Sequence, residues 1–292
     1  MQTDPQNTTL FFGVGATKAG TSWLHSKLQA HPECHLKTIK EFHYFSLTNP
    51  RQVERAVKTA KADAAAAQVK ARGADLEKRD YANRRVADLT TWCGVLQAGL
   101  GAYDRYLDYL RQGIGSRHLI GDVTPGYSLL PAETLTMMSR LTSDVRFVFL
   151  MRDPVERLWS HVRMVSARAD RSNFAGGSLK LMAAILAGES TNEIEGILKR
   201  GDYCAILDNL ARSVPDKQRL IAYYEDMFAP GGLTQVCNFL GISPVEPAAE
   251  DRVHAGMPLT LPPALRAQAK EFLRPQYQGV QQRLGRIPSG WA

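Results

Sequence analysis

The chain has 292 residues, of which 44% are hydrophobic and 22% are charged, an ordinary composition that excludes disordered, collagen-like and mucin-like proteins. No run approaches about 18 uninterrupted apolar residues, and the polar first residues lack the basic and then apolar pattern of a secretory signal. The net charge of +7 favours an anionic partner, such as a nucleotide, nucleic acid, acidic glycan or membrane surface, or reflects solubility alone.

The first predicted elements are a strand and a helix joined by a glycine-containing loop. Residues 10–15 (LFFGVG) form a short apolar run typical of a buried strand. Residues 21–30 have helical character and stop before His31-Pro32, because a residue that precedes proline disfavours the helical conformation. This order of elements opens many nucleotide-binding α/β folds.

The middle of the chain predicts mostly helix. Residues 53–87 are rich in Ala, Lys, Arg and Glu, with one glycine and no proline, which predicts two helices broken near Gly73. Their basic residues form either a solvated face or a surface for an acidic acceptor. We treat 51–112 as a helical insertion, and within 164–200 we expect Gly176-Gly177 to mark a loop.

Three more segments predict strands. A short one covers 118–120 before Gly121-Asp122, and 145–151 (VRFVFLM) is a buried strand that leads into a helix from Val155. Another covers 219–224. No internal repeat or Pro-rich linker is present, so we predict a single domain, 1–292, with a central, mostly parallel sheet flanked by helices in three layers.

The cysteines are widely spaced and form no CxxC pair, which favours neither a zinc site nor a disulfide framework. We predict reduced, mostly buried thiols in a cytoplasmic protein; they are Cys34, Cys93, Cys204 and Cys237.

The loop from Gly15 to Ser22 compares with the phosphate-binding pattern GxxxxGK[ST]. Gly15 and Gly20 have the required spacing, but Thr21 stands where that pattern has lysine, and Lys18 lies inside the loop. Successive backbone N–H groups and the positive end of the following helix favour an anion. The missing lysine argues against ATP or GTP hydrolysis. The alternative is a tight strand–helix turn with a solvent-facing lysine.

Two motifs together resemble sulfotransferases that use 3′-phosphoadenosine 5′-phosphosulfate (PAPS). TKAGTSWL at 17–24 resembles the loop that binds the 5′-phosphosulfate. FVFLMRDPVERLWSHVRM at 147–164 resembles the 3′-phosphate motif, with Arg152 at a strand end and Ser160 two helical turns later. Arginine offers a planar fork of donors to phosphate. The resemblance implies a P-loop NTPase-like α/β fold.

Further matching segments run in order to the end of the chain and are closest in style to the glycan and heparan sulfate branch and its bacterial relatives. They are KEFHYF at 40–45, GDVTPGY at 121–127, RGDYCAILDNL at 200–210, YYEDM at 223–227, FLGI at 239–242 and Trp291. Two departures stand out. Val123 replaces a lysine common in that branch, and the loop at 250–258 lacks the family's glycine- and basic-rich run, which Arg252 and His254 partly replace.

The resemblance implies a donor site. Its residues are Lys18, Ala19, Gly20, Thr21 and Ser22 at the phosphosulfate, Arg152 and Ser160 at the 3′-phosphate, and Trp23 and Tyr203 as candidates to contact adenine. Trp23 has a core position as its alternative. The product would be 3′-phosphoadenosine 5′-phosphate (PAP), and the family's chemistry needs no metal.

The resemblance also implies an in-line transfer to a hydroxyl or amine acceptor, with Lys18, Glu41 and His43 as catalytic residues. We predict Glu41 as the general base, with a pKa raised by burial near an anionic donor. If the segment is extended, His43 shares a face with Glu41. It would then orient Glu41, contact the sulfuryl group or be the base itself.

Other functions remain as alternatives. A P-loop kinase-like phosphotransferase would need the absent lysine and a magnesium-binding carboxylate, for which Asp122 is the one candidate. A nucleic-acid-binding protein would need a basic stripe with interleaved aromatic residues, which the sequence lacks. A PAPS-binding protein without catalysis is disfavoured by the intact Lys18 and Glu41. The acceptor, whether a small molecule, glycan, lipid or peptide tyrosine, and the oligomeric state stay open.

Overall fold

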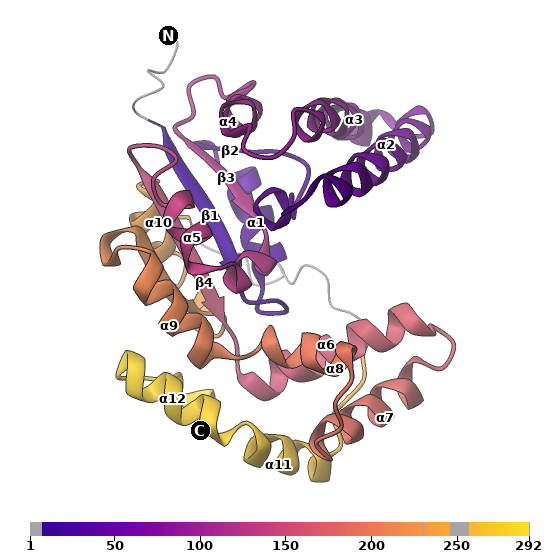
Figure 1. Ribbon diagram of the computed structural model, residues 1–292, viewed down its shortest axis with the longest axis vertical. Helices are drawn as coiled ribbons and strands as arrows, with labels where there is room; N and C mark the ends of the chain where they lie inside the picture. The colour runs from indigo at the N-terminus through magenta and orange to yellow at the C-terminus, as the bar shows by residue number, and fades with distance from the viewer. Residues whose placement is uncertain (1–7, 230, 246–256, 292) are drawn as a thin grey trace.

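A five-stranded parallel sheet forms the centre of the structure, in the order β2-β3-β1-β4-β5 (Figure 1). The computed structural model describes residues 8–229, 231–245 and 257–291. The strands are β1 (Thr9–Gly15), β2 (Cys34–Leu36), β3 (Leu119–Val123), β4 (Val145–Met151) and β5 (Arg219–Tyr223). Helices cover both faces of a parallel sheet, so its central strands read as continuous apolar runs.

Helices and short 3₁₀ turns connect the strands. The α-helices are α1 (Thr21–Ala30), α2 (Pro50–Arg72), α3 (Leu76–Gln97), α4 (Tyr103–Arg111), α5 (Ala132–Met138), α6 (Pro154–Ala169), α7 (Phe174–Leu186), α8 (Asn192–Lys199), α9 (Tyr203–Ser213), α10 (Thr234–Leu240), α11 (Pro263–Phe272) and α12 (Arg274–Leu284). The 3₁₀ turns are η2 (Tyr44–Ser46), η3 (Pro125–Leu129), η4 (Asp216–Gln218), η5 (Asp226–Phe228) and η6 (Ser289–Trp291). None of the helices within the described residues is long and apolar enough to cross a membrane.

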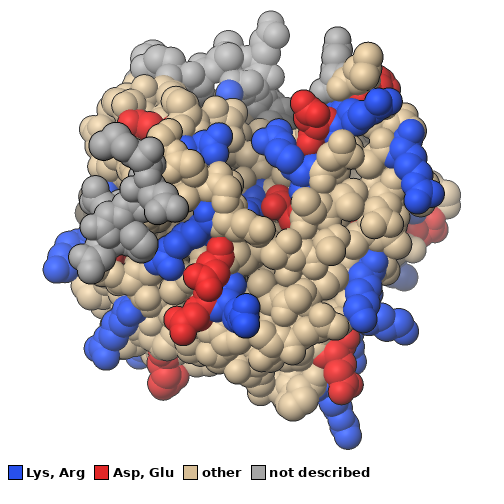
Figure 2. All heavy atoms as spheres, turned by 90° about the horizontal axis from the view of Figure 1, so that it is seen from above, with Lys and Arg blue, Asp and Glu red and all other residues tan. Residues whose placement is uncertain are grey.

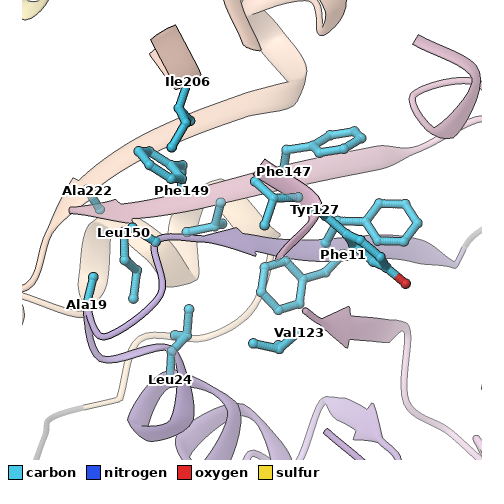
Figure 3. Close-up of a cluster of buried hydrophobic side chains, with 14 of the residues drawn as sticks. Phe11, Ala19, Leu24, Val123, Tyr127, Phe147, Phe149, Leu150, Ile206 and Ala222 are labelled. Atoms are coloured by element: carbon cyan, nitrogen blue, oxygen red, sulfur yellow. The ribbon is translucent and has the colours of Figure 1, made fainter. Parts of the chain in front are cut away.

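Core side chains lie on both faces of the sheet. Figure 3 shows Phe149 of β4 next to Ile206 of α9, while Leu150 lies on the opposite face, on the side of Ala19 and Leu24. Successive residues of a strand point to opposite faces, and all five side chains are nearly or completely buried. The predicted three-layer α/β fold is therefore confirmed.

The sheet differs from the sequence prediction at two places. The short strand expected at 118–120 continues through Gly121 and Asp122 to Val123. The strand β2 was missed because its sequence, CHL, has no apolar run. It forms through pairing with β3, where Cys34 lies opposite Leu119.

The helices α2 and α3 pack against each other and project away from the sheet (Figure 1). Asn49 accepts a hydrogen bond from the Gln52 N–H at the start of α2, and Pro50 occupies the first turn. The chain breaks at Gly73, as predicted. The helix α4 then returns to β2 and β3.

The prediction of a loop at Gly176-Gly177 was wrong, because both glycines lie inside α7. Glycine costs a helix about 1 kcal/mol relative to alanine. Here α7 packs along α6, and Gly177 faces Ser166 of that helix at ordinary contact distance. Tertiary packing thus outweighs the local preference.

The loop between β1 and α1 requires glycine at residue 20. Gly20 adopts φ +91° at the start of α1, and a Cβ at this position would overlap the ring of Tyr224. Lys18 also has a left-handed backbone, with φ 72°. These two residues turn the chain sharply out of the sheet and into the helix.

We expect Gly20→Ala to destabilise the fold more than Gly99→Ala. Gly99 has a similar φ of +85° but open space around a Cβ, so both variants carry the backbone strain and only the first carries the overlap. The difference should be about 1–3 kcal/mol in the free energy of unfolding, the usual cost of overpacking. Urea denaturation of both variants measures it, and equal losses would show that Tyr224 moves aside freely.

Candidate active site

A cavity of about 560 Å³ lies where the loops after the parallel strands meet. Its lining comes from residues far apart in the sequence, because parallel strands place their carboxyl ends at one edge of the sheet. The lining residues are Thr17, Lys18, Gly20, Thr21, Ser22, Trp23, Lys40, Glu41, His43, Pro125, Gly126, Arg152, Ser160, His161, Met164, Val165, Arg168, Arg200 and Tyr224.

Most of the predicted site residues meet in this cavity. Those that line it are Lys18, Gly20, Thr21, Ser22, Trp23, Glu41, His43, Arg152 and Ser160. Ala19 and Tyr203 do not. Ala19 is completely buried in the core, and its N–H donates to the carbonyl of Ala16 at 3.1 Å. It shapes the loop, and its amide is not directed to a ligand.

Positive charge dominates the cavity wall. The cations are Lys18, Lys40, Arg152, Arg168 and Arg200, and among the described lining residues they face the single carboxylate of Glu41. Burial lowers the pKa of Lys18, and the neighbouring cations Arg163 and Arg168 lower it further. Such a concentration of like charges is stable when an anion occupies the site.

The helix α1 adds to this positive wall. It begins at Thr21, and no side chain caps its start at Gly20. Helix N-termini carry unpaired N–H groups and a partial positive charge. The first turn, with Thr21 and Ser22, therefore presents amides and hydroxyls to an anionic ligand beside Lys18.

Arg152 is held from behind by Tyr203. The Tyr203 hydroxyl accepts from the Arg152 N–H at 3.1 Å and donates to its carbonyl at 2.8 Å. Tyr203 is completely buried, so it positions Arg152, and contact with adenine does not fit its place. The guanidinium lies over the Tyr224 ring, 5.0 Å from its centroid, and 3.5 Å from Glu156.

Trp23 belongs mainly to the core. Trp23 is 2% exposed, and its indole packs against Phe228 with ring centroids 4.9 Å apart. It still forms part of the cavity wall. Trp23 therefore occupies the core position that was its alternative and also lines the cavity.

The segment of Glu41 is turned, so the extended backbone that would place His43 and Glu41 on one face is not present. Glu41 and His43 both have left-handed backbones, with φ 65° and 55°, and the Glu41 N–H donates to the Val123 carbonyl at 3.1 Å. Their side chains still meet, with His43 Nε2 3.5 Å from Glu41 Oε2. Lys40 Nζ lies 2.6 Å from the other carboxylate oxygen.

The expected rise of the Glu41 pKa is wrong. The carboxylate is 45% exposed, so burial is too weak to neutralise it. The hydrogen bond from His43, followed by the charge of Lys40, lowers its pKa to about 2. Glu41 is therefore ionised at neutral pH and is a weak base in the free protein.

Asp122 lies beneath the cavity and is not available to a ligand. It is completely buried, and its carboxylate accepts hydrogen bonds from the hydroxyls of Thr124, Tyr127 and Tyr106 at 2.7, 2.8 and 2.9 Å. Burial raises its pKa. The described residues contain no group of three or more His, Cys, Asp or Glu side chains arranged to hold a metal ion.

Several lining residues were missed by the sequence analysis. Four of them share one face of α6: His161, Met164, Val165 and Arg168. Counted from His161, they occupy positions i, i+3, i+4 and i+7, a spacing that could have indicated this face. Lys40, Arg200 and Tyr224 lie in the matching segments at 40–45, 200–210 and 223–227, but the sequence analysis gave them no role in the site. Arg252 and His254, suggested as replacements in the 250–258 loop, lie outside the described residues.

We expect His43→Ala and Lys40→Met each to raise the pKa of Glu41. The hydrogen bond from His43 is the largest single cause of the lowered pKa, and the charge and hydrogen bond of Lys40 also lower it. Carboxyl carbon NMR during a pH titration measures both variants, with the exposed Glu133, which does not line the cavity, as the reference signal. An unchanged Glu41 pKa in either variant would contradict this geometry.

Comparisons with known proteins show the family of the chain and support its fold. The sequence profile of the sulfotransferase family matches residues 11–247. No curated protein sequence matches the chain. Similar solved structures include a sulfotransferase from Alicyclobacillus acidocaldarius, with 19% identity, 96% and 97% of the two chains covered and a TM-score of 0.61. Another is the sulfotransferase domain of the Synechococcus PCC 7002 olefin synthase, with 18% identity, 99% of each chain covered and a TM-score of 0.51. At these identities the structures support the fold, and the profile, which spans most of the chain, shows that it belongs to the sulfotransferase family.

Proposed function

We propose that this sulfotransferase transfers the sulfuryl group of PAPS to a hydroxyl or amine acceptor. The observation that carries the proposal is one cationic cavity that joins Lys18 and the start of α1 to Arg152 and Ser160. The first pair suits the 5′-phosphosulfate, and the second suits the 3′-phosphate that distinguishes PAPS from ATP and AMP.

The transfer itself follows from this placement. The acceptor oxygen or nitrogen attacks sulfur, the bond from sulfur to the 5′-phosphate oxygen breaks, and PAP leaves with the electron pair. Lys18 and the first-turn amides of α1 stabilise the charge that develops on the leaving phosphate. The acceptor's proton passes to a base on the other side of the sulfuryl group.

We propose that His43 takes this proton and that Glu41 orients its ring. Glu41 has a pKa of about 2, whereas an efficient base has a pKa near the working pH. Its Oε2 oxygen lies 3.5 Å from His43 Nε2. The other ring nitrogen, Nδ1, has no hydrogen-bond partner in the described part of the chain and can accept the proton. This arrangement revises the expected assignment of Glu41 as the base and keeps both residues in the reaction.

The other functions are less well supported. A phosphotransferase would need a carboxylate free to bind magnesium, and the hydroxyls around Asp122 occupy it. On the face shown in Figure 2, Lys and Arg side chains are interspersed with Asp and Glu and separated by uncharged residues. That pattern is unlike the continuous basic stripe of many nucleic-acid-binding proteins. A glycan, lipid or small-molecule acceptor, a single domain over 1–292 and a cytoplasmic location remain predictions.

We expect PAP to raise the melting temperature, and AMP to do so far less, because AMP lacks the 3′-phosphate. Arg152→Ala should weaken PAP binding by roughly 2–3 kcal/mol, the scale of charge-assisted hydrogen bonds to phosphate. Arg212→Ala, an exposed site on α9 outside the cavity, serves as the control in calorimetry. Equal stabilisation by AMP and PAP would remove the 3′-phosphate from the proposal.

We expect His43→Ala to slow single-turnover transfer from saturating PAPS by on the order of 10²–10⁴-fold, the usual loss for a general base. Glu41→Gln keeps a hydrogen-bond acceptor and should lose less. Neither variant should change PAP affinity much, whereas Lys18→Ala should reduce affinity and turnover together. Added imidazole should partly restore His43→Ala. A greater loss in Glu41→Gln, without rescue of His43→Ala, would return the role of base to Glu41.

A further inference from the structure

Arg157 of α6 is a buried cation that has no acidic partner among the described residues. Arg157 is 2% exposed, and within the described part of the chain it forms no ion pair. Its Nη2 is 3.5 Å from the Ile197 carbonyl, where α8 nears its end. A Cβ on Gly201 would overlap the guanidinium, so the glycine makes room for it. A buried charge is costly unless something opposite in charge lies near it.

The contact between Arg157 and His161 determines which ring nitrogen of His161 carries the hydrogen. Arg157 Nη1 lies 3.4 Å from His161 Nδ1. A guanidinium can only donate, so Nδ1 must accept. The neutral ring then carries its proton on Nε2. Among the described residues, no hydrogen-bond partner occupies Nε2, although His161 is only 5% exposed and lines the cavity.

The surroundings keep this ring neutral. Among the described residues, the charges that act most strongly on it are cations: Arg157 and Arg168 on α6, Arg200 after α8 and Lys18 in the β1–α1 loop. Burial, followed by these charges, lowers the pKa of His161 to about 3. Throughout the physiological range the side chain is therefore a neutral donor with one available N–H.

We propose that His161 donates this Nε2–H to an anionic oxygen of the donor nucleotide's phosphate or phosphosulfate groups, with Arg157 as the positioning residue that fixes the tautomer. The proposal rests on the proposed function. The arrangement gives the anion a hydrogen bond that does not change with pH, and the unpaired charge of Arg157 acts on it through a poorly solvated wall. His161 adds selectivity for an acceptor oxygen at a place where a lysine would add only charge.

The tautomer can be tested without any nucleotide. In protein labelled with ¹⁵N-histidine, His161, assigned by its loss in His161→Gln, should show the neutral Nε2–H form from pH 5 to 8. Arg157→Met should give a mixture of the two neutral tautomers, because no guanidinium then holds Nδ1 as an acceptor. It should fold because apolar replacements of buried charges are often tolerated. An Nδ1–H ring or an imidazolium at pH 6 in the wild type would overturn the proposal.

Calorimetry with PAP tests the ligand. We expect His161→Ala to weaken PAP binding about 10- to 100-fold, the scale of a hydrogen bond to a charged group. His161→Gln, which retains an N–H donor, should recover most of the loss, and His118→Ala, at the amino end of β3, should have no effect.

The two proposals fail in different ways. If the wild type binds PAP and His161→Ala binds it equally well, the role of His161 is wrong and the proposed function stands. If the wild type does not bind PAP, the proposed donor is wrong, and the nucleotide as the ligand of His161 is wrong with it. If Arg157→Met does not fold, the wild-type tautomer and the two His161 variants still decide between these outcomes.

Discussion

The parallel alignment of the sheet is the constraint on which the site depends. With every strand pointing the same way, the segments that follow the strands all begin at the same edge of the sheet. Lys18 follows β1, Lys40 and Glu41 follow β2, Arg152 follows β4 and Tyr224 follows β5. Antiparallel pairing of any one strand would send its functional residue to the far edge. The register of β1 between β3 and β4, buried on both faces, is what brings these charges together.

Much of this arrangement could be predicted because it is encoded locally. A continuous apolar run followed by glycines and a helical segment specifies β1, its loop and α1 within a few residues. Arg152 at the end of β4 is specified in the same way. Local sequence does not predict the strand β2 or the position of Arg200 in the cavity wall, because each depends on contacts with distant segments.

The electrostatics were harder to predict than the positions. The expectation for Glu41 assumed a buried carboxylate, and burial raises a carboxyl pKa. The left-handed turns at Glu41 and His43 instead leave the carboxylate half-exposed and bring a histidine and a lysine onto it. Sequence spacing placed these side chains near one another, but it could not tell which of two opposing effects on the pKa is larger.

Large phenol rings hold the cationic groups from beneath. Tyr203 bonds both backbone groups of Arg152, and Tyr224 contacts its guanidinium and leaves no room for a side chain at Gly20. The two ends of the proposed donor site are thus supported by one shared ring. A substitution at Tyr224 therefore affects the surroundings of both Arg152 and Gly20. Its effect on the free energy of unfolding is not expected to add to that of a substitution at either residue.

The hydroxyls around Asp122 tie the projecting helices to the chemistry. Tyr106 comes from α4, which follows the α2–α3 pair. Thr124 and Tyr127 flank Pro125 and Gly126, which line the cavity. Excision of α2 to α4 would remove one of the donors to a completely buried carboxylate and expose the aromatic cluster around it. The helical segment therefore contributes to the hydrogen bonds that hold the loop of Pro125 and Gly126 in the cavity wall.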